Sequence, residues 1–273
     1  MTELYLNGEY LAIEAGKVSV EDRGFQFGDG GYEVVRVYRG EPFRLKEHLD
    51  RLRRTLAGID LALPEPAGGV ESICRRVLGG LQEATIYLQV TRGAAPRAHG
   101  WSDDLRPTIV AYARACSAPA PGSAYTLLTV PDDRWGRCHL KTTGLLANVL
   151  AKQAAKKSGA DEALFVRDGR IVTEGGSSNA FLVRDGAIIT HPATNLIPDG
   201  ITRRAVIELA KARGIRVEER PFTPAEALEA SEFFMTSTTI EVMPVVRIDR
   251  RPISLGPVAA QLRADYARLA GRD

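Results

Sequence analysis

The chain has 273 residues, enough to bury one large hydrophobic core or two modest ones. Apolar residues make up 44% of it and charged residues 26%, a balance that is typical of a globular protein and argues against disorder. The formal net charge is +2 and the basic residues are spread along the chain, so nucleic acid is not an implied partner.

No targeting or membrane segment is expected. The first nine residues lack a basic region followed by an apolar core, and no run approaches the roughly eighteen apolar residues that a membrane helix needs. The three cysteines, Cys74, Cys116 and Cys138, are an odd number without the spacing of metal ligands. We therefore expect reduced thiols in a cytoplasmic protein, and no metal site.

Short strands and helices alternate in the first part of the chain. Asn7 and Gly8 stand between two apolar runs and predict a hairpin turn. Leucines recur at spacings of three and four residues from Leu45 to Leu56, which predicts an amphipathic helix. In chain order, the patterns predict strands at 4–6, 10–13, 32–38, 85–91 and 108–113 and helices at about 46–58 and 70–82.

A segment rich in proline and small residues, Cys116 to Ser123, divides the chain. We expect an N-terminal α/β domain at 1–116, a linker at 117–123, and a C-terminal α/β domain at 124–273 that carries Lys141. The absence of a regular repeat predicts an α+β chain of two lobes. In the second lobe, strands are predicted at 125–130, 163–166, 170–173, 179–183, 215–218 and 232–236, and helices at about 143–158, from 201 onward, and at about 255–270.

Lysine is scarce, with seven lysines among the 36 basic residues. Six of them lie in polar or helical-surface contexts, whereas Lys141 follows Leu140 at the end of a predicted strand and precedes a predicted helix. A partly desolvated lysine amine favours its neutral form and can form a Schiff base with a carbonyl compound. A surface charge is the alternative for any single lysine.

A second candidate is Glu174, which ends a predicted strand just before Gly175 and Gly176. A carboxylate in this place can pair with a protonated ring nitrogen, as pyridoxal phosphate requires in order to act as an electron sink. A hairpin turn explains the same residues equally well.

Two segments offer donors to an anion such as phosphate. The helix predicted after Gly200 has free N–H groups at its start, together with the Thr202 hydroxyl. The run from Thr236 to Thr239 follows an apolar strand and adds hydroxyls and amides. Each segment is ambiguous, because Ser and Thr also cap helices for purely structural reasons.

The loop from Thr91 to His99 carries Arg97 and His99 two residues apart. In extended backbone the two side chains point the same way, and together they could bind one carboxylate, since a guanidinium binds carboxylates bidentately. A solvated surface turn is the alternative.

Taken together, these motifs resemble those of the fold type IV pyridoxal-phosphate enzymes, and most of all the D-amino acid aminotransferases. The resemblance covers nearly the whole chain. It is carried by Glu21 to Val34, Glu47 to Leu52, Tyr87 to Gly93, Arg97-Ala98-His99, Leu140-Lys141, Asn148 to Lys152, Thr173-Glu174-Gly175, Gly200 to Arg203, and Thr236 to Glu241.

The resemblance implies a role for each matching residue toward pyridoxal 5'-phosphate. Lys141 would hold the cofactor covalently and then move a proton between the substrate Cα and the cofactor, and Glu174 would face the pyridine nitrogen. The phosphate would be bound by Arg51, the amides of Ile201 and Thr202, and Thr238 or Thr239. Ser177 would be a further cofactor-binding residue.

The resemblance also implies the substrate and the assembly. Tyr32, Arg97 and His99 would bind the substrate carboxylate, and in the family the arginine and histidine reach the pocket from the neighbouring subunit of a homodimer. The reaction would be a ping-pong exchange between a D-amino acid, such as D-alanine or D-glutamate, and a 2-oxo acid, 2-oxoglutarate or pyruvate.

Three departures from the family pattern leave open which substrate side chains the protein prefers. Gly31 and Gly176 stand where the family has a branched residue and a serine, and Thr142-Thr143-Gly144 replaces a Ser-Leu-Asn sequence. The alternatives of the same fold are a branched-chain L-amino acid aminotransferase and an aminodeoxychorismate lyase. The alternative of another class is a phosphometabolite-binding protein without catalysis.

Overall fold

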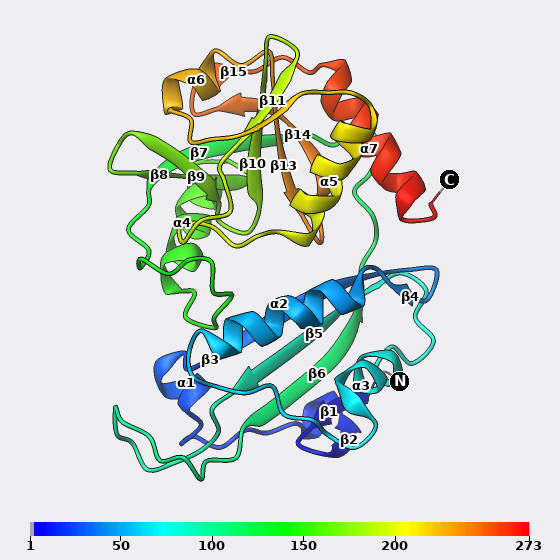
Figure 1. Cartoon of the computed structure of the whole chain (residues 1–273), viewed down its shortest axis with the longest axis vertical. Helices are drawn as coiled ribbons and strands as arrows, with labels where there is room; N and C mark the ends of the chain where they lie inside the picture. The colour runs from blue at the N-terminus through cyan, green and yellow to red at the C-terminus, as the bar shows by residue number, and fades with distance from the viewer. Residues whose placement is uncertain (1–2, 273) are drawn as a thin grey trace. The chain divides into compact units, whose positions relative to one another are not determined.

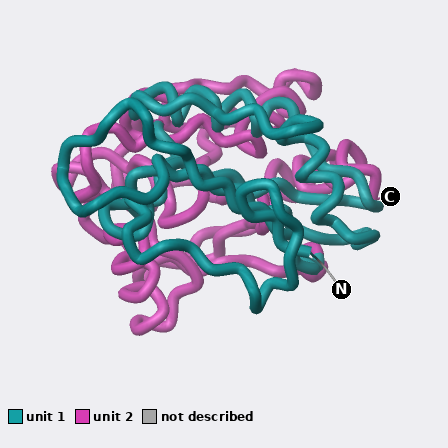
Figure 2. The backbone as a smooth tube through the Cα atoms, turned by 90° about the horizontal axis from the view of Figure 1, so that it is seen from below, with its two compact units in different colours: residues 1–117, 140–145 teal, residues 118–139, 146–273 magenta. Residues whose placement is uncertain are grey.

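The computed structural model describes residues 3–272, so part of the nine-residue N-terminal segment considered above lies outside the described residues. The chain forms two compact units (Figure 2): unit 1 comprises residues 1–117 and 140–145, and unit 2 comprises residues 118–139 and 146–273. The predicted linker begins at this division. The segment around Lys141, expected in the second domain, instead belongs to unit 1, because the N–H of Tyr32 donates to the Lys141 carbonyl and that of Thr143 to the Gly30 carbonyl, each at 3.0 Å.

Unit 1 is built on a six-stranded sheet in which every neighbouring pair is antiparallel. The hairpin predicted at Asn7 and Gly8 is confirmed, and so are the other strands predicted there. Across the sheet the order is β2 (Glu9–Ala12), β1 (Glu3–Leu6), β6 (Thr108–Ala115), β5 (Ala84–Thr91), β3 (Gly30–Tyr38) and β4 (Glu41–Pro42).

The two faces of this sheet differ because side chains alternate along each strand. Val35 and Leu88 point to the face covered by α2 (Leu45–Ala57), where Leu52 is fully buried. Figure 1 shows α2 lying along the sheet. Burying a leucine of this kind contributes roughly 1.5–3 kcal/mol, so the leucine spacing alone explains the helix. The other face presents the tyrosines described below.

Three further short elements complete unit 1. The 3₁₀ turn η1 (Ile13–Ala15) and the helix α1 (Arg23–Phe27) were not expected. The helix α3 (Gly69–Arg76) ends earlier than the predicted residue 82, because the backbone turns at Gly79 and Gly80, which both have positive φ.

Unit 2 contains a nine-stranded sheet of mixed direction. Its β7–β8, β7–β14 and β11–β12 pairs are parallel, and its remaining pairs are antiparallel. The order is β12 (Val217–Glu219), β11 (Ala187–Thr190), β10 (Asn179–Arg184), β13 (Glu232–Ser237), β14 (Glu241–Ile248), β7 (Tyr125–Pro131), β8 (Glu162–Arg167) and β9 (Ile171–Gly175), with β15 (Arg251–Pro252) beside β14.

Three strands of this sheet were not predicted, namely β11, β14 and the two-residue β15. The hairpin between β10 and β11 turns at Asp185 and Gly186, both with positive φ, a turn signal that the sequence does carry. The strand β14 contains Pro244, a residue that normally argues against a strand, yet β14 lies between β7 and β13. Tertiary pairing has overridden the local preference here.

Four helices accompany the sheet: α4 (Leu146–Lys157), α5 (Ile201–Ala212), α6 (Pro224–Leu228) and α7 (Pro257–Leu269). The helix α4 begins three residues later than predicted, because the residues before it pair with the start of β3. For the same reason Lys141 lies in an irregular segment and not at the end of a strand. Within residues 3–272, no helix combines the length and apolar character needed to cross a membrane. The mixture of helices and largely antiparallel strands confirms the α+β class.

Candidate functional site

The amine of Lys141 lies beside Tyr32. Its Nζ is 3.2 Å from the Tyr32 hydroxyl and 4.3 Å from the centre of the ring. Both side chains are half-buried, so the amine is partly shielded from water and still accessible. Two residues predicted to act in the site, one on the cofactor and one on the substrate, are therefore in contact.

Tyr32 belongs to a row of aromatic rings on the face of the sheet opposite α2. Its ring stacks on Tyr87 at 5.7 Å, and Tyr87 stacks on Tyr112 at 5.2 Å. Burial, with the neighbouring phenols, raises the pKa of Tyr87, whose hydroxyl donates to Gln89 Oε1 at 2.6 Å. The row gives Tyr32 a rigid support, since aromatic pairs of this kind add about 0.5–1.5 kcal/mol beyond burial.

The backbone around Lys141 is held independently of its side chain. The Lys141 N–H donates to Thr55 Oγ1 at 3.1 Å, and Thr55 belongs to α2. A Cβ at Gly31 would lie 2.9 Å from Thr55 Cγ2, so glycine at this position leaves room for Thr55. The departure from the family pattern at Gly31 therefore has a packing reason.

Arg51, expected at the phosphate, forms a bidentate ion pair with Glu33. Its Nε and Nη2 donate to the two carboxylate oxygens at 2.7 and 2.8 Å. Glu33 is fully buried on the α2 side of β3 and is also 2.7 Å from His48 Nδ1. Burial would raise the pKa of Glu33, but Arg51 and His48 outweigh it and hold that pKa well below its usual range. This pair fixes the direction of the Arg51 guanidinium.

Burial lowers the pKa of His48, because the charged imidazole would lose its hydration, and this effect exceeds the opposing attraction of Glu33. The folded chain thus binds fewer protons at His48 than the unfolded chain, in which the imidazole has its ordinary pKa of 6.5. The neutral form of His48 therefore contributes to the free energy of unfolding at pH values above the pKa of the unfolded chain. This contribution should be lost as the pH falls through the pKa that His48 has in the folded chain.

Urea unfolding between about pH 8 and pH 5.5 tests this expectation, because the unfolded imidazole titrates within that interval. The stability of the natural protein should fall toward the acidic end, and His48→Gln should flatten part of the slope while keeping a donor for Glu33. His191, whose pKa burial also lowers, remains in both proteins. An unchanged slope in the variant would contradict the assignment to His48.

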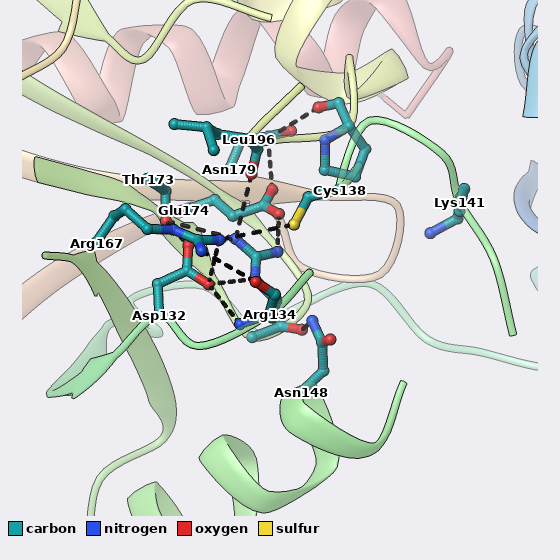
Figure 3. A network of polar contacts seen from close by, with 12 residues as sticks. Asp132, Arg134, Cys138, Lys141, Asn148, Arg167, Thr173, Glu174, Asn179 and Leu196 are labelled. Carbon is teal, nitrogen blue, oxygen red and sulfur yellow. Dashed lines mark hydrogen bonds and ion pairs between the residues drawn. The ribbon is translucent and has the colours of Figure 1, made fainter. Parts of the chain in front are cut away.

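In unit 2, Glu174 is buried at the end of β9 and is held through both carboxylate oxygens (Figure 3). Arg134 Nη1 donates to Oε1 at 2.5 Å, and Asn179 Nδ2 donates to Oε2 at 3.1 Å. The arrangement presents Glu174 as a hydrogen-bond acceptor in one orientation.

Arg134 is itself fixed by a second carboxylate. Its Nε and Nη2 donate to the two oxygens of Asp132 at 2.8 and 2.9 Å, and its guanidinium lies 4.3 Å from the centre of the Phe165 ring. Thr173 Oγ1 and Arg167 Nη2 also contact Asp132, at 2.7 and 3.1 Å. Burial would raise the pKa of Asp132, but these partners lower it. The Arg134 guanidinium thus bridges two buried carboxylates.

The start of α5 lies against the same group of residues. No side chain caps this helix, and the N–H groups of Ile201 and Thr202 in its first turn have no carbonyl four residues earlier in the helix. A Cβ at Gly200 would lie 2.0 Å from Asn179 Oδ1, so only glycine allows this approach. One amide side chain, Asn179, therefore lies next to the helix start and binds Glu174.

Hydroxyl groups accompany this helix start. Within residues 3–272, Ser178 Oγ and Thr236 Oγ1 are buried without a hydrogen-bond partner, and Thr236 is paired with Asn179 across β10 and β13. Thr238 and Thr239 follow β13, and Thr239 Oγ1 is 3.4 Å from Ser237 Oγ. The free amides of this helix start, with the unpartnered hydroxyls of Ser178 and Thr236 next to and opposite Asn179, are a donor set that fits a phosphate and so suits pyridoxal phosphate.

Ser177, expected to bind the cofactor, is exposed, and its hydroxyl donates to Glu162 Oε2 at 2.9 Å. A Cβ at Gly176 would lie 2.8 Å from Glu162 Oε1, so the other departure from the family pattern accommodates this carboxylate. Ser178 is the buried serine of the loop. The structure thus pairs Ser177 with an acid.

Arg97 and His99 lie together on one aromatic ring of unit 1. The Arg97 guanidinium is 4.5 Å from the centre of the Phe27 ring, and the His99 ring meets Phe27 edge-on at 5.7 Å. Both side chains belong to exposed residues of the loop. Arg97 and His99, which were predicted to act together, therefore pack on the same ring, that of Phe27.

Several residues of these networks were missed by sequence reasoning, namely Glu33, Arg134 and Asn179. The sequence offers weak signals for two of them: Glu33 is an acid at a core-facing position of a strand, and Arg134 follows Asp132 after an apolar strand. Their partners lie 18 and 40 residues away, so spacing alone does not connect them.

Comparisons with known proteins identify the family. The model of the family described as amino-transferase class IV matches residues 30–248. The chain is 42% identical over 260 residues to a D-alanine aminotransferase of Bacillus licheniformis, covering 93% of this chain and 91% of that protein. It is 40% identical over 274 residues to the D-alanine aminotransferase of Staphylococcus haemolyticus, covering 97% of both.

Solved structures agree on the fold. The branched-chain aminotransferase of Thermoproteus uzoniensis with norvaline has a TM-score of 0.90 at 27% identity, covering 100% of this chain and 96% of that one. A second branched-chain amino acid aminotransferase, solved with pyridoxamine 5'-phosphate, has a TM-score of 0.91 at 30% identity, covering 99% of this chain and 95% of that one. The expected fold type IV is confirmed, and the chain belongs to the class IV aminotransferases.

Proposed function

We propose that this protein is a pyridoxal-phosphate-dependent transaminase that exchanges the amino group of a D-amino acid with the oxo group of a 2-oxo acid. The observation that carries the chemistry is the Lys141 amine, 3.2 Å from the Tyr32 hydroxyl in a half-buried setting. The similarity to D-alanine aminotransferases over nearly the whole chain supports the D-enantiomer.

Each residue has a stated task in this proposal. Pyridoxal phosphate, when bound, withdraws the electrons left at the substrate Cα as its proton departs. Lys141 holds the cofactor and then takes and returns the Cα proton as the general base and acid. Glu174, oriented by Arg134 and Asn179, accepts the hydrogen bond of the ring nitrogen and keeps it protonated.

The phosphate is assigned to a larger set of donors. The donors come from two places: the Arg51 guanidinium, which is held by Glu33, and the start of α5 beside Asn179. The proposed phosphate ligands are Arg51, the amides of Ile201 and Thr202, and Thr238 or Thr239. Ser177 is proposed only as a further residue of the cofactor site.

The carboxylate of the substrate is assigned to Tyr32, Arg97 and His99. A guanidinium and an imidazole on one aromatic ring form a compact pair of donors for a single carboxylate. When the carboxylate is fixed and Lys141 takes the proton from one side, only one enantiomer presents its Cα proton correctly. The stereochemistry of the reaction thus follows from the positions of these groups.

The half-reaction without a second substrate tests this function. The purified holoenzyme should lose its yellow absorption when D-alanine or D-glutamate is added and keep it with L-leucine. Since several solved neighbours are named branched-chain aminotransferases, L-leucine is the decisive comparison. Loss of colour with L-leucine only would refute the D-specific proposal, and a protein that binds no pyridoxal phosphate would refute the enzyme proposal.

We also place the protein in the cytoplasm, on the ground that Cys74, Cys116 and Cys138 are unpaired thiols. We propose a homodimer, supported by the exposed apolar stripe of Leu146, Val149 and Leu150 on α4, whose exposed fractions are 71, 59 and 61%. Residues at these spacings share one helix face. In this homodimer the exposed Arg97 and His99 would reach the substrate pocket of the second copy of the chain.

Leu150→Glu is expected to yield a monomer, because a charge in an apolar interface must be desolvated on association. Sedimentation velocity of the holoenzyme measures the change, and transamination of D-alanine should fall with it. Ala260→Glu adds the same charge to an exposed position of another helix, α7, and serves as the control. A natural protein that sediments as a monomer, or a Leu150→Glu dimer of unchanged stability, would contradict the prediction.

A further inference from the structure

One buried guanidinium, that of Arg23, binds the backbone of the loop that carries Arg97 and His99. Arg23 Nη1 donates to the carbonyls of Ala98 and Gly100 at 2.6 and 3.3 Å, and Nη2 donates to the carbonyl of His99 at 3.0 Å. The loop has no regular secondary structure, and these residues are exposed. Three consecutive carbonyls converging on one side chain fix the path of the loop, because a guanidinium offers five donors in a rigid fork.

The charge of Arg23 is balanced inside the protein. Its Nε donates to Asp29 Oδ2 at 2.8 Å, and its side chain is only 5% exposed. Arg92 binds both oxygens of the same carboxylate, at 2.9 and 3.0 Å, and otherwise donates to the carbonyls of Ile59 and Asp60. The two arginines therefore share Asp29, but only Arg23 holds the carbonyls of the loop.

The short helix that carries Arg23 is itself anchored to the sheet. Asp22 caps it by accepting from the Gly24 N–H at 2.8 Å and from Thr91 Oγ1 at 2.9 Å. The Arg23 N–H donates to the Gly93 carbonyl at 2.8 Å. Thr91 is the last residue of β5, so the position of α1 follows from the end of a central strand.

The last residue of the same helix is the aromatic support of the loop side chains. Phe27 has the guanidinium of Arg97 at 4.5 Å and the ring of His99 at 5.7 Å, while Arg23 lies 4.9 Å from its centre. One helix thus positions the loop twice, through the backbone carbonyls and through the two side chains. Cation–π contacts of this kind favour a guanidinium placed over the face of a ring.

We propose that Arg23 is a positioning residue for substrate binding, which holds the loop so that Arg97 and His99 meet the substrate carboxylate as one unit. This inference rests on the proposed role of those two residues. Arg23 acts through the loop, since its side chain donates to Asp29 and to the carbonyls of Ala98, His99 and Gly100.

The test is the replacement Arg23→Met in the holoenzyme, with D-alanine and 2-oxoglutarate as the substrates. The KM for D-alanine should rise by about 10-fold, since hydrogen bonds to a charged group are lost and the loop is released. The kcat should change by less than about 3-fold, because Lys141 and Glu174 keep their surroundings. Trypsin should also cut after Arg97 faster than in the natural protein.

Arg92→Met is the matched control. It removes the other partner of Asp29 and a guanidinium contact with the Trp101 ring at 3.8 Å, and it leaves the three carbonyl bonds in place. It should leave the KM nearly unchanged. The combination with Arg97→Ala decides whether Arg23 acts through Arg97. The effect of Arg23→Met on kcat/KM should largely disappear in the Arg97→Ala protein, because the residue that it positions is gone.

The outcomes are distinct. Equal rises in KM for Arg23→Met and Arg92→Met, or an Arg23→Met effect that persists in full without Arg97, would overturn the inference. A KM that rises in Arg97→Ala but stays constant in Arg23→Met would overturn the role of Arg23 and leave the proposed function intact. A KM that is unchanged in Arg97→Ala would refute the proposed carboxylate site itself. Should Arg23→Met not fold, Phe27→Leu removes the aromatic support, keeps Arg23, and should raise the KM in the same selective way.

Discussion

Replacing Lys141 with alanine is expected to reduce transamination by a factor on the order of 10⁴, because the general base and acid for the Cα proton is removed. The protein should also no longer fix pyridoxal phosphate covalently when treated with borohydride. The fold should persist, since the backbone bonds of Lys141 to Thr55 and Tyr32 do not involve its side chain. Stopped-flow absorbance with D-alanine measures the loss directly.

Lys46→Ala is the control for this substitution. Lys46 is an exposed lysine of the same unit, and its surface ion pair with Asp50 contributes little to stability. Its removal should change neither the cofactor spectrum nor the rate. A Lys141→Ala protein that still becomes labelled under borohydride, or that retains its rate, would show that another amine holds the cofactor.

Replacing Arg134 with methionine is expected to lower the free energy of unfolding by roughly 3–5 kcal/mol, the usual cost of removing one partner of a buried ion pair. Asp132 and Glu174 would then remain buried without the guanidinium that bridges them. Methionine keeps contact with Phe165, so the loss reports the charge more than the packing. Urea unfolding followed by circular dichroism measures the change.

Arg167→Met distinguishes the effect of losing a partner of Asp132 alone from the effect of losing the guanidinium that binds both Asp132 and Glu174. Arg167 contacts Asp132 at 3.1 Å and is more exposed than Arg134, so its loss should cost clearly less. The binding of pyridoxal phosphate should weaken in Arg134→Met and change little in Arg167→Met, because Arg134 donates to Glu174 whereas Arg167 pairs with Asp132. Equal effects of the two variants on stability and on cofactor binding would contradict the role given to Arg134.

Much of the fold could be predicted because its signals are local. The hairpin at Asn7 and Gly8, the leucine stripe of α2 and the glycine at the start of α5 are confirmed. The start of α4 and the strand β14 could not be predicted, because pairing with distant strands overrode the local preference. The same holds for the segment of Lys141, whose backbone partners come from the start of β3.

The sequence by itself determined which chemical groups this protein has and the family to which it belongs. Lys141, Glu174 and the pair Arg97 and His99 were readable as candidates because the type of a side chain and its spacing along the chain are properties of the sequence. Their roles toward cofactor and substrate remain predictions that the variants above test.

Only the tertiary structure decided which groups hold these candidates in place. Arg134 meets Glu174 across 40 residues, and Arg23 meets the carbonyl of Ala98 across 75. A guanidinium at the end of a long flexible side chain can serve many partners, and the sequence does not state which one it will meet. The packing of strands and helices makes that choice, because a buried charge is stable only where partners for its hydrogen bonds converge.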